Sequence, residues 1–213
     1  MPRRSSSAAG FTLIEMAIML TVFGLTLLGG IQAIRSQAHK ATFEKAQEDL
    51  RAIQTALLGF LAVNGRLPCP DRDFDGLEES ACANANQSGW VPWQTLQVKP
   101  LDPWGHLYTY RVRQSYAVSI TGAGTGVGND ITVRNLDGTG DISTTVPVIV
   151  VSHGRNGLGA RTMEGAALPA ATLAAEVENA NQDATFQFGG DDQLLWIPAN
   201  VLQYYALKAG WTL

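Results

Sequence analysis

The chain has 213 residues with a formal net charge of −4 at pH 7, and 46% of its residues are hydrophobic. This content is enough for a buried core and excludes a disordered tail. The mildly acidic charge, with no block of like charges, excludes nucleic-acid binding by a basic face.

The N-terminal segment is long and apolar. Residues 11–34 contain one ionisable side chain, Glu15, and are long enough to span a bilayer as a single helix. The small residues Ala8, Ala9 and Gly10 precede this run, whereas an ordinary signal peptide has its cleavage site after it. Because a carboxylate in a membrane helix is costly, Glu15 indicates a function and needs a cationic partner. No Lys, Arg or His lies within two turns of Glu15, so we expect that partner from another molecule or from a newly made N-terminus.

An amphipathic helix is predicted to continue over residues 35–66. The chain has no proline between Phe11 and Arg66, and its apolar residues recur at spacings of three and four. These residues are Phe43, Ala46, Leu50, Ile53, Leu57, Phe60 and Leu61. Asn64 and Gly65, followed by Pro68, predict the end of the helix.

Residues 67–213 change to turns and short alternating runs, which are typical of β-structure. The predicted strands are 107–112 and 115–120, paired as a hairpin, and 130–134, 146–152, 186–188 and 194–197. Residues 166–178 predict a loop with one short helix. A long helix followed by an antiparallel sheet gives an α+β fold, and the amphipathic helix is the natural cover for that sheet.

Two cysteines, Cys69 and Cys82, follow the predicted helix. In an exported chain, two nearby thiols favour a disulfide over a metal site, which normally needs four ligands.

An acidic run lies between these cysteines. It matches the first half of an EF-hand-type calcium loop, which has carboxylates at alternate positions before a glycine. The matching residues are Asp71, Asp73, Asp75 and Gly76. The glutamate expected at position twelve is replaced by Cys82, although Glu79 offers a further carboxylate. An acidic solvated turn is the favoured interpretation, and calcium binding is the alternative.

The start of the chain resembles a known processing signal. Arg3-Arg4, then the run from Gly10 to Glu15 (GFTLIE) and an apolar stretch, closely resemble the class III signal of type IV pilins and type II secretion pseudopilins. The resemblance implies that prepilin peptidase cuts after Gly10 and methylates Phe11, the new N-terminus. It also implies that Glu15 pairs with the terminal amine of a neighbouring subunit during assembly.

Later segments are similar to pseudopilins related to the major type II one. They are Pro100–Gly105 (PLDPWG) and Ser152–Gly157 (SHGRNG). Some relatives bind calcium near the C-terminus, where Asp191 and Asp192 would be the ligands; the alternative is that these residues cap a turn before the last strand. Residues 158–185 form an insert for which the family offers no counterpart.

The resemblance implies a structural subunit of a type II secretion pseudopilus. We expect a leader (1–10), a transmembrane and filament-core helix (11–34), an amphipathic helix (35–66) and a periplasmic sheet domain (67–213). The expected partners are prepilin peptidase, other subunits of the filament and an inner-membrane assembly platform, with a single span of the bacterial inner membrane. No enzyme activity and no required cofactor are predicted, with calcium left open. The alternatives are a minor pilin of a type IV pilus, serving adhesion, motility or DNA uptake, and a membrane-tethered periplasmic binding module or enzyme.

Overall fold

The structure is a computed structural model, and it describes residues 12–82, 87–123 and 130–213, without the side chains of residues 26–36 and 38. Gly10, Phe11 and the rest of the predicted leader lie outside the described residues. The chain divides into two compact units, Met1–Thr42 and Phe43–Leu213.

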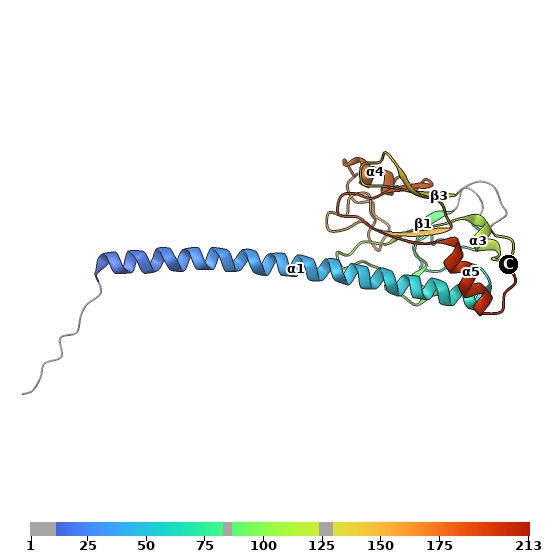
Figure 1. Ribbon diagram of the computed structural model, residues 1–213, viewed down its shortest axis with the longest axis horizontal. Helices are drawn as coiled ribbons and strands as arrows, with labels where there is room; N and C mark the ends of the chain where they lie inside the picture. The colour runs from blue at the N-terminus through green and yellow to red at the C-terminus, as the bar shows by residue number, and fades with distance from the viewer. Residues whose placement is uncertain (1–11, 83–86, 124–129) are drawn as a thin grey trace, which may run out of the picture. The chain divides into compact units, whose positions relative to one another are not determined.

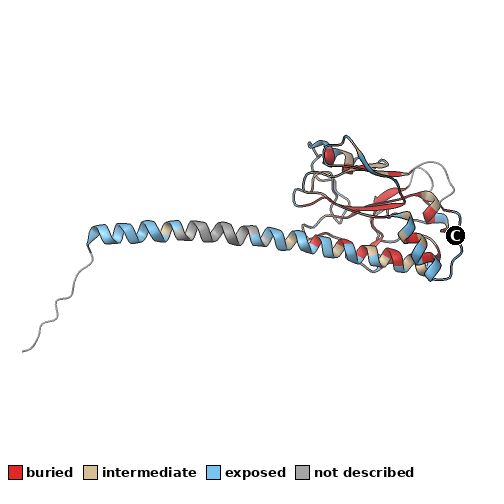
Figure 2. Ribbon diagram, viewed as in Figure 1, coloured by how far each residue is buried: buried red, intermediate tan, exposed pale blue. Residues whose placement is uncertain are grey.

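Helix α1 runs over Leu13–Asn64 and belongs to both units (Figure 1). Within the second unit, one face of α1 is buried (Figure 2). The buried side chains follow the predicted spacing: Ala46, Leu50, Ile53, Leu57 and Leu61. The helix ends where Gly65, at a φ of 65°, donates its N–H to the Leu61 carbonyl at 2.8 Å.

A four-stranded antiparallel sheet covers this face of α1. Its strands are β1 (Ser88–Trp90), β2 (Thr109–Val112), β5 (Val148–Ser152) and β7 (Gln193–Ile197), in the order β1-β2-β5-β7. Val148 and Val150 of β5 pack in the core shared with α1, whereas Ile149 and Val151 pack in a second core. Strand β5 is thus buried on both faces, which explains its uninterrupted apolar sequence.

The first core is completed by short helices. These are α3 (Gln114–Val118) and the C-terminal α5 (Ala199–Lys208), while α2 (Trp93–Leu96) lies at the edge of the same core. From α5, Leu202 and Ala206 are fully buried against α1 and the sheet. The α5 helix is therefore a second cover for the sheet beside α1.

A smaller sheet lies on the opposite side of the large one. It contains β3 (Ile131–Arg134), β4 (Asp141–Val146) and β6 (Thr185–Gln187) in the order β4-β3-β6. Ile131, Val133 and Phe186 pack against the outer face of β5, and α4 (Ala174–Ala180) precedes β6. The second unit thus has three layers, of helices, large sheet and small sheet.

The predicted α+β fold is confirmed, and so is the role of α1 as a cover for the sheet. The predicted hairpin of 107–112 with 115–120 is wrong, because residues 114–118 form α3. Strand β2 already pairs with β1 and β5 on its two edges, so no edge is left for a hairpin partner. Instead, Tyr116 enters the core and its carbonyl accepts the N–H of Leu67 at 2.8 Å.

Four further elements, β1, α2, β4 and α5, were not predicted, and β3 pairs with β6 in parallel rather than antiparallel orientation.

Candidate functional site

The described apolar side chains of α1 in the first unit are exposed. They include Leu13, Ile14, Met16, Ile18, Met19, Leu20, Val22, Phe23 and Leu25. A stretch of this kind needs an apolar partner that lies outside the single chain. No helix combines the length and the hydropathy of a membrane span over the part of the chain that the structure describes.

Glu15 lies on this stretch and is engaged with Thr12. The Thr12 backbone N–H and hydroxyl donate to Glu15 Oε2, each at 3.0 Å, and the Glu15 N–H donates back to Thr12 Oγ1 at 3.3 Å. This reciprocal pair is a capping box at the start of α1. The sequence analysis missed it, although the spacing of Thr12 and Glu15 is its usual signal. Glu15 therefore has a local partner that is neutral, and its carboxylate charge stays uncompensated by this contact.

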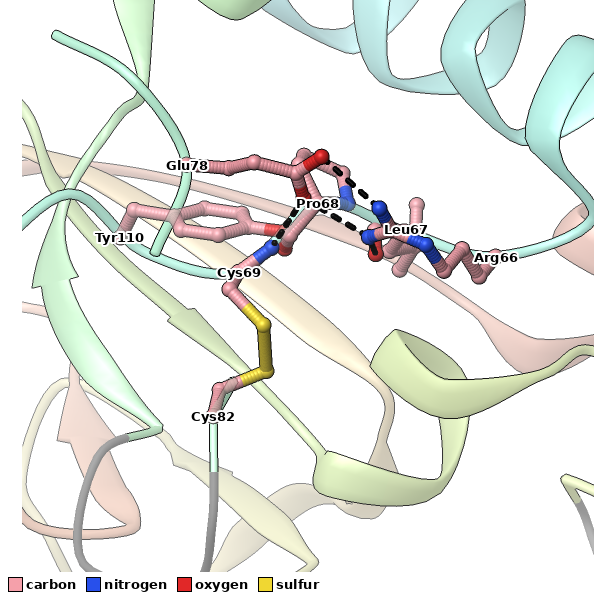
Figure 3. The surroundings of a disulfide bond; sticks show 7 residues. All are labelled: Arg66, Leu67, Pro68, Cys69, Glu78, Cys82 and Tyr110. Carbon is pink, nitrogen blue, oxygen red and sulfur yellow. Dashed lines mark hydrogen bonds and ion pairs between the residues drawn. A yellow bond between two sulfur atoms is a disulfide. The ribbon is translucent and has the colours of Figure 1, made fainter. Parts of the chain in front are cut away.

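The predicted disulfide between Cys69 and Cys82 is confirmed (Figure 3). Beside it, Arg66 binds Glu78 with two parallel bonds, Nη1 to Oε2 at 2.7 Å and Nη2 to Oε1 at 2.8 Å. Glu78 Oε2 also accepts the Cys69 N–H at 3.1 Å, and the buried Tyr110 hydroxyl donates to the Pro68 carbonyl at 3.0 Å. The chain leaving α1 is thus held by a covalent bond, an ion pair and a tyrosine.

The acidic loop brings Asp71, Asp73 and Asp75 together, with a carboxylate oxygen of each within 4.8 Å of the others; Glu79 is not in this group. Buried Asp71 accepts the N–H groups of Asp73 at 3.1 Å and of Phe74 at 2.9 Å on Oδ1, and that of Gly76 at 3.0 Å on Oδ2. Burial raises the pKa of Asp71, and these bonds oppose the rise. The Asp71 carboxylate therefore organises the loop by itself, whether or not a cation binds.

A second acidic cluster contains Glu176 of α4 with Asp191 and Asp192, which precede β7. One carboxylate oxygen of each residue lies within 4.8 Å of the others. Burial raises the pKa of Asp192 to about 7, and the neighbouring carboxylates add to the rise. The structure thus joins the two predicted residues to Glu176, which sequence reasoning missed because nothing around it in the Ala-rich segment signals a ligand.

The segment Pro100–Gly105 forms a turn that is organised by Asp102. Its Oδ1 accepts the N–H groups of Trp104 at 3.0 Å and His106 at 2.9 Å, and its Oδ2 accepts the Ser152 hydroxyl at 2.7 Å. His106 Nδ1 lies 3.7 Å from Asp102 Oδ2, and this carboxylate raises the pKa of His106. Asp102 therefore fastens the turn to strand β5.

Comparison with known proteins shows what this chain is similar to. Residues 33–135 match the family "Type II secretion system (T2SS), protein G". Over this region, just under half of the chain, it is similar to that family. The Type II secretion system core protein G of Pseudomonas aeruginosa is 27% identical to this chain over 143 residues, which are 64% of this chain and 99% of the relative.

Two other relatives carry the same name. That of Aeromonas hydrophila is 27% identical over 47% of this chain and 70% of its own length. That of Escherichia coli is 26% identical over 50% of this chain and 73% of its own length. No solved structure matches the chain.

Proposed function

We propose that the protein is a structural subunit of a type II secretion pseudopilus. The observation that carries this proposal is the similarity to a type II secretion core protein G over 99% of that relative's length. The α+β fold, with its long N-terminal helix, agrees with this role. The exposed apolar part of α1 supplies the surface through which subunits would pack.

We infer that assembly follows the processing signal at the start of the chain. Prepilin peptidase cuts after Gly10 and methylates Phe11, and the new terminal amine then meets Glu15 of a neighbouring subunit. A carboxylate and an amine lose their desolvation penalty in an apolar environment only when they pair. The pair therefore sets the register between subunits, while the apolar contacts supply the free energy of association.

The proposed location is the bacterial inner membrane, with a single span near the N-terminus and the sheet domain in the periplasm. An inner-membrane assembly platform would receive the processed subunit. The disulfide between Cys69 and Cys82 supports a periplasmic second unit, because disulfides persist in oxidising compartments.

The proposal is tested by deleting the gene and complementing it with variants of Glu15. We expect secreted proteins to accumulate in the periplasm of the deletion strain, and Glu15→Gln to fail to restore secretion. Glu44→Gln is the matched control, because Glu44 is an exposed acid elsewhere on α1, in the second unit. Intact-mass measurement of the extracted protein tests the processing step, and a mass that still includes residues 1–10 would contradict it.

The same experiment separates the alternatives. Normal secretion with loss of surface pili, twitching or DNA uptake would identify a minor pilin of a type IV pilus. Full function of the Glu15→Gln variant would favour a membrane-tethered binding module or enzyme, since a tether does not need the acid.

We further propose that calcium is a structural ligand of the second unit, at Asp191 and Asp192. The residues fit a cation, because Asp191 Oδ1 and Asp192 Oδ1 are buried and have no hydrogen-bond partner among the described residues. The first acidic loop, Asp71 to Asp75, stays a prediction as a calcium site. Titration calorimetry of Asp192→Asn and of Asp73→Asn with calcium assigns any binding to one cluster or the other.

A further inference from the structure

The inserted segment 158–185 reaches the second acidic cluster through α4. Glu176 is 3% exposed and the Asp192 side chain is fully buried, although both carry carboxylates. In the sequence, Glu176 precedes β6 and Asp192 follows it. Asp191 is the third member of the cluster. Three carboxylates at one place, two of them buried, are unfavourable unless something of opposite charge joins them.

The hydrogen bonds leave part of this cluster unsatisfied. Asn156 donates its side-chain amide to Glu176 Oε1 at 2.8 Å and its N–H to Asp191 Oδ2 at 2.9 Å. Asn179 donates to Asp192 Oδ2 at 2.9 Å. The second oxygen of Asp191 and that of Asp192 remain without a partner in the described part of the chain. An orphaned buried carboxylate oxygen is costly, so these two oxygens point to a ligand.

Helix α4 and the turn before β7 lie close together because the turn has two glycines, Gly189 and Gly190, where they meet. Gly189 and Gly190 both have positive φ, at 154° and 64°. A Cβ on Gly190 would collide with Glu176 Oε1, and one on Gly189 would collide with the Ala175 side chain. The two glycines therefore allow the turn before β7 to lie directly on α4.

The chemistry of the donors selects the cation. The donor atoms of the cluster are carboxylate oxygens, which hard cations prefer. Calcium binds oxygen at about 2.4 Å, so one ion can bridge oxygens that lie up to about 4.8 Å apart. The carboxylate oxygens of the cluster lie within 4.8 Å of one another, so all three fit around one calcium ion.

We propose that Glu176 is the third carboxylate ligand of this calcium site, and that α4 is a clamp which the ion fastens to the turn before β7. The inference rests on the proposed calcium site at Asp191 and Asp192 and adds the ligand that the insert supplies. The insert then has a definite function: calcium joins it to the large sheet.

The test uses the full chain in detergent, with calcium chloride, EGTA or magnesium chloride, and compares the wild type with three variants. Glu176→Gln removes the proposed ligand charge, and Asp192→Asn removes the site. Glu178→Gln is the matched control on the same helix, because Glu178 pairs with Arg134, at 3.1 Å, rather than with the cluster.

We expect calcium to raise the melting temperature of the wild type and of Glu178→Gln, and to protect segment 158–185 from proteolysis. Calorimetry should show at least tenfold weaker calcium binding for Glu176→Gln. In EGTA, Glu176→Gln should be at least as stable as the wild type, since it removes carboxylate repulsion. A residue that merely supports the fold would not reverse its effect between calcium and EGTA.

Two results would overturn these ideas separately. Wild-type affinity in Glu176→Gln, together with lost binding in Asp192→Asn, would refute the α4 ligand and leave the calcium site intact. An absence of any calcium effect on the wild type would refute the calcium site as well. Neither result bears on the role in secretion, which the gene deletion tests by itself.

Discussion

The indole ring of Trp211 lies over Gly65, so close that a Cβ built on Gly65 would be 2.9 Å from three of the ring carbons. Trp211 Nε1 also donates to the Ala62 carbonyl at 3.0 Å. Trp211 therefore fastens the C-terminus of the chain to the last turn of α1.

Gly65→Ala should destabilise the second unit, by about 1–3 kcal/mol, because the new Cβ meets Trp211 and the residue keeps a positive φ. Gly59→Ala is the control: a Cβ there meets nothing within 4 Å, and alanine in a helix interior stabilises by about 0.5–1 kcal/mol. Urea unfolding followed by tryptophan fluorescence measures both. Equal effects of the two substitutions would contradict the contact with Trp211.

Leu57→Ala should lower the free energy of unfolding by about 2–5 kcal/mol, because Leu57 is fully buried between α1 and the large sheet. Val63→Ala lies on the same helix but is 78% exposed, so we expect a change below about 0.5 kcal/mol. Denaturant unfolding of the two variants measures the difference, and a similar loss in both would show that α1 does not cover the sheet.

The double substitution Cys69→Ala and Cys82→Ala should destabilise the second unit by about 3 kcal/mol, the usual value for a loop of this length. The Arg66–Glu78 ion pair should persist, because neither side chain depends on the sulfur atoms. Unfolding of the wild type with and without reductant measures the contribution of the disulfide to stability independently. If reduction leaves the melting temperature unchanged, the disulfide contributes nothing to stability.

His106 should make stability depend on pH. Its pKa is raised in the folded state by Asp102, so the pair stabilises the fold below the unfolded pKa of about 6.5. That contribution is lost as the pH rises through the folded value. The wild type should therefore lose more stability than His106→Gln between pH 6 and pH 8.5. Asp192 titrates in both proteins, so only their difference is informative, and parallel pH curves would contradict the prediction.

Elements with a strong local pattern could be predicted from the sequence. The buried face of α1 follows the spacing from Ala46 to Leu61, and strand β5 is an uninterrupted apolar run. The Cys69–Cys82 disulfide could be predicted from the proximity of two thiols in a chain that is expected to be exported. In each case the decisive interactions lie close in sequence or repeat at a regular period.

Elements decided by distant contacts could not be predicted. Residues 115–120 have strand-like composition, but Tyr116 fills the core and β2 has no free edge, so tertiary packing overrides propensity. Glu176 joins Asp191 and Asp192 only because α4 folds onto the turn before β7. The α5 helix had a local signal, with buried Leu202 and Ala206 four residues apart and Gly210 just past its end, and it could have been found.

The strands of the small sheet come from two separate segments of the chain. Strands β3 and β4 lie between β2 and β5 in sequence, and β6 lies between β5 and β7. Thr132 pairs with Thr185, so this sheet closes only after β5 and the later insert have been synthesised. The apolar face of the β3–β4 hairpin, with Ile131 and Val133, is therefore made before β6 and its Phe186, which pack with it. Until β6 is made, this hairpin is an exposed apolar edge at which the unfinished chain can aggregate.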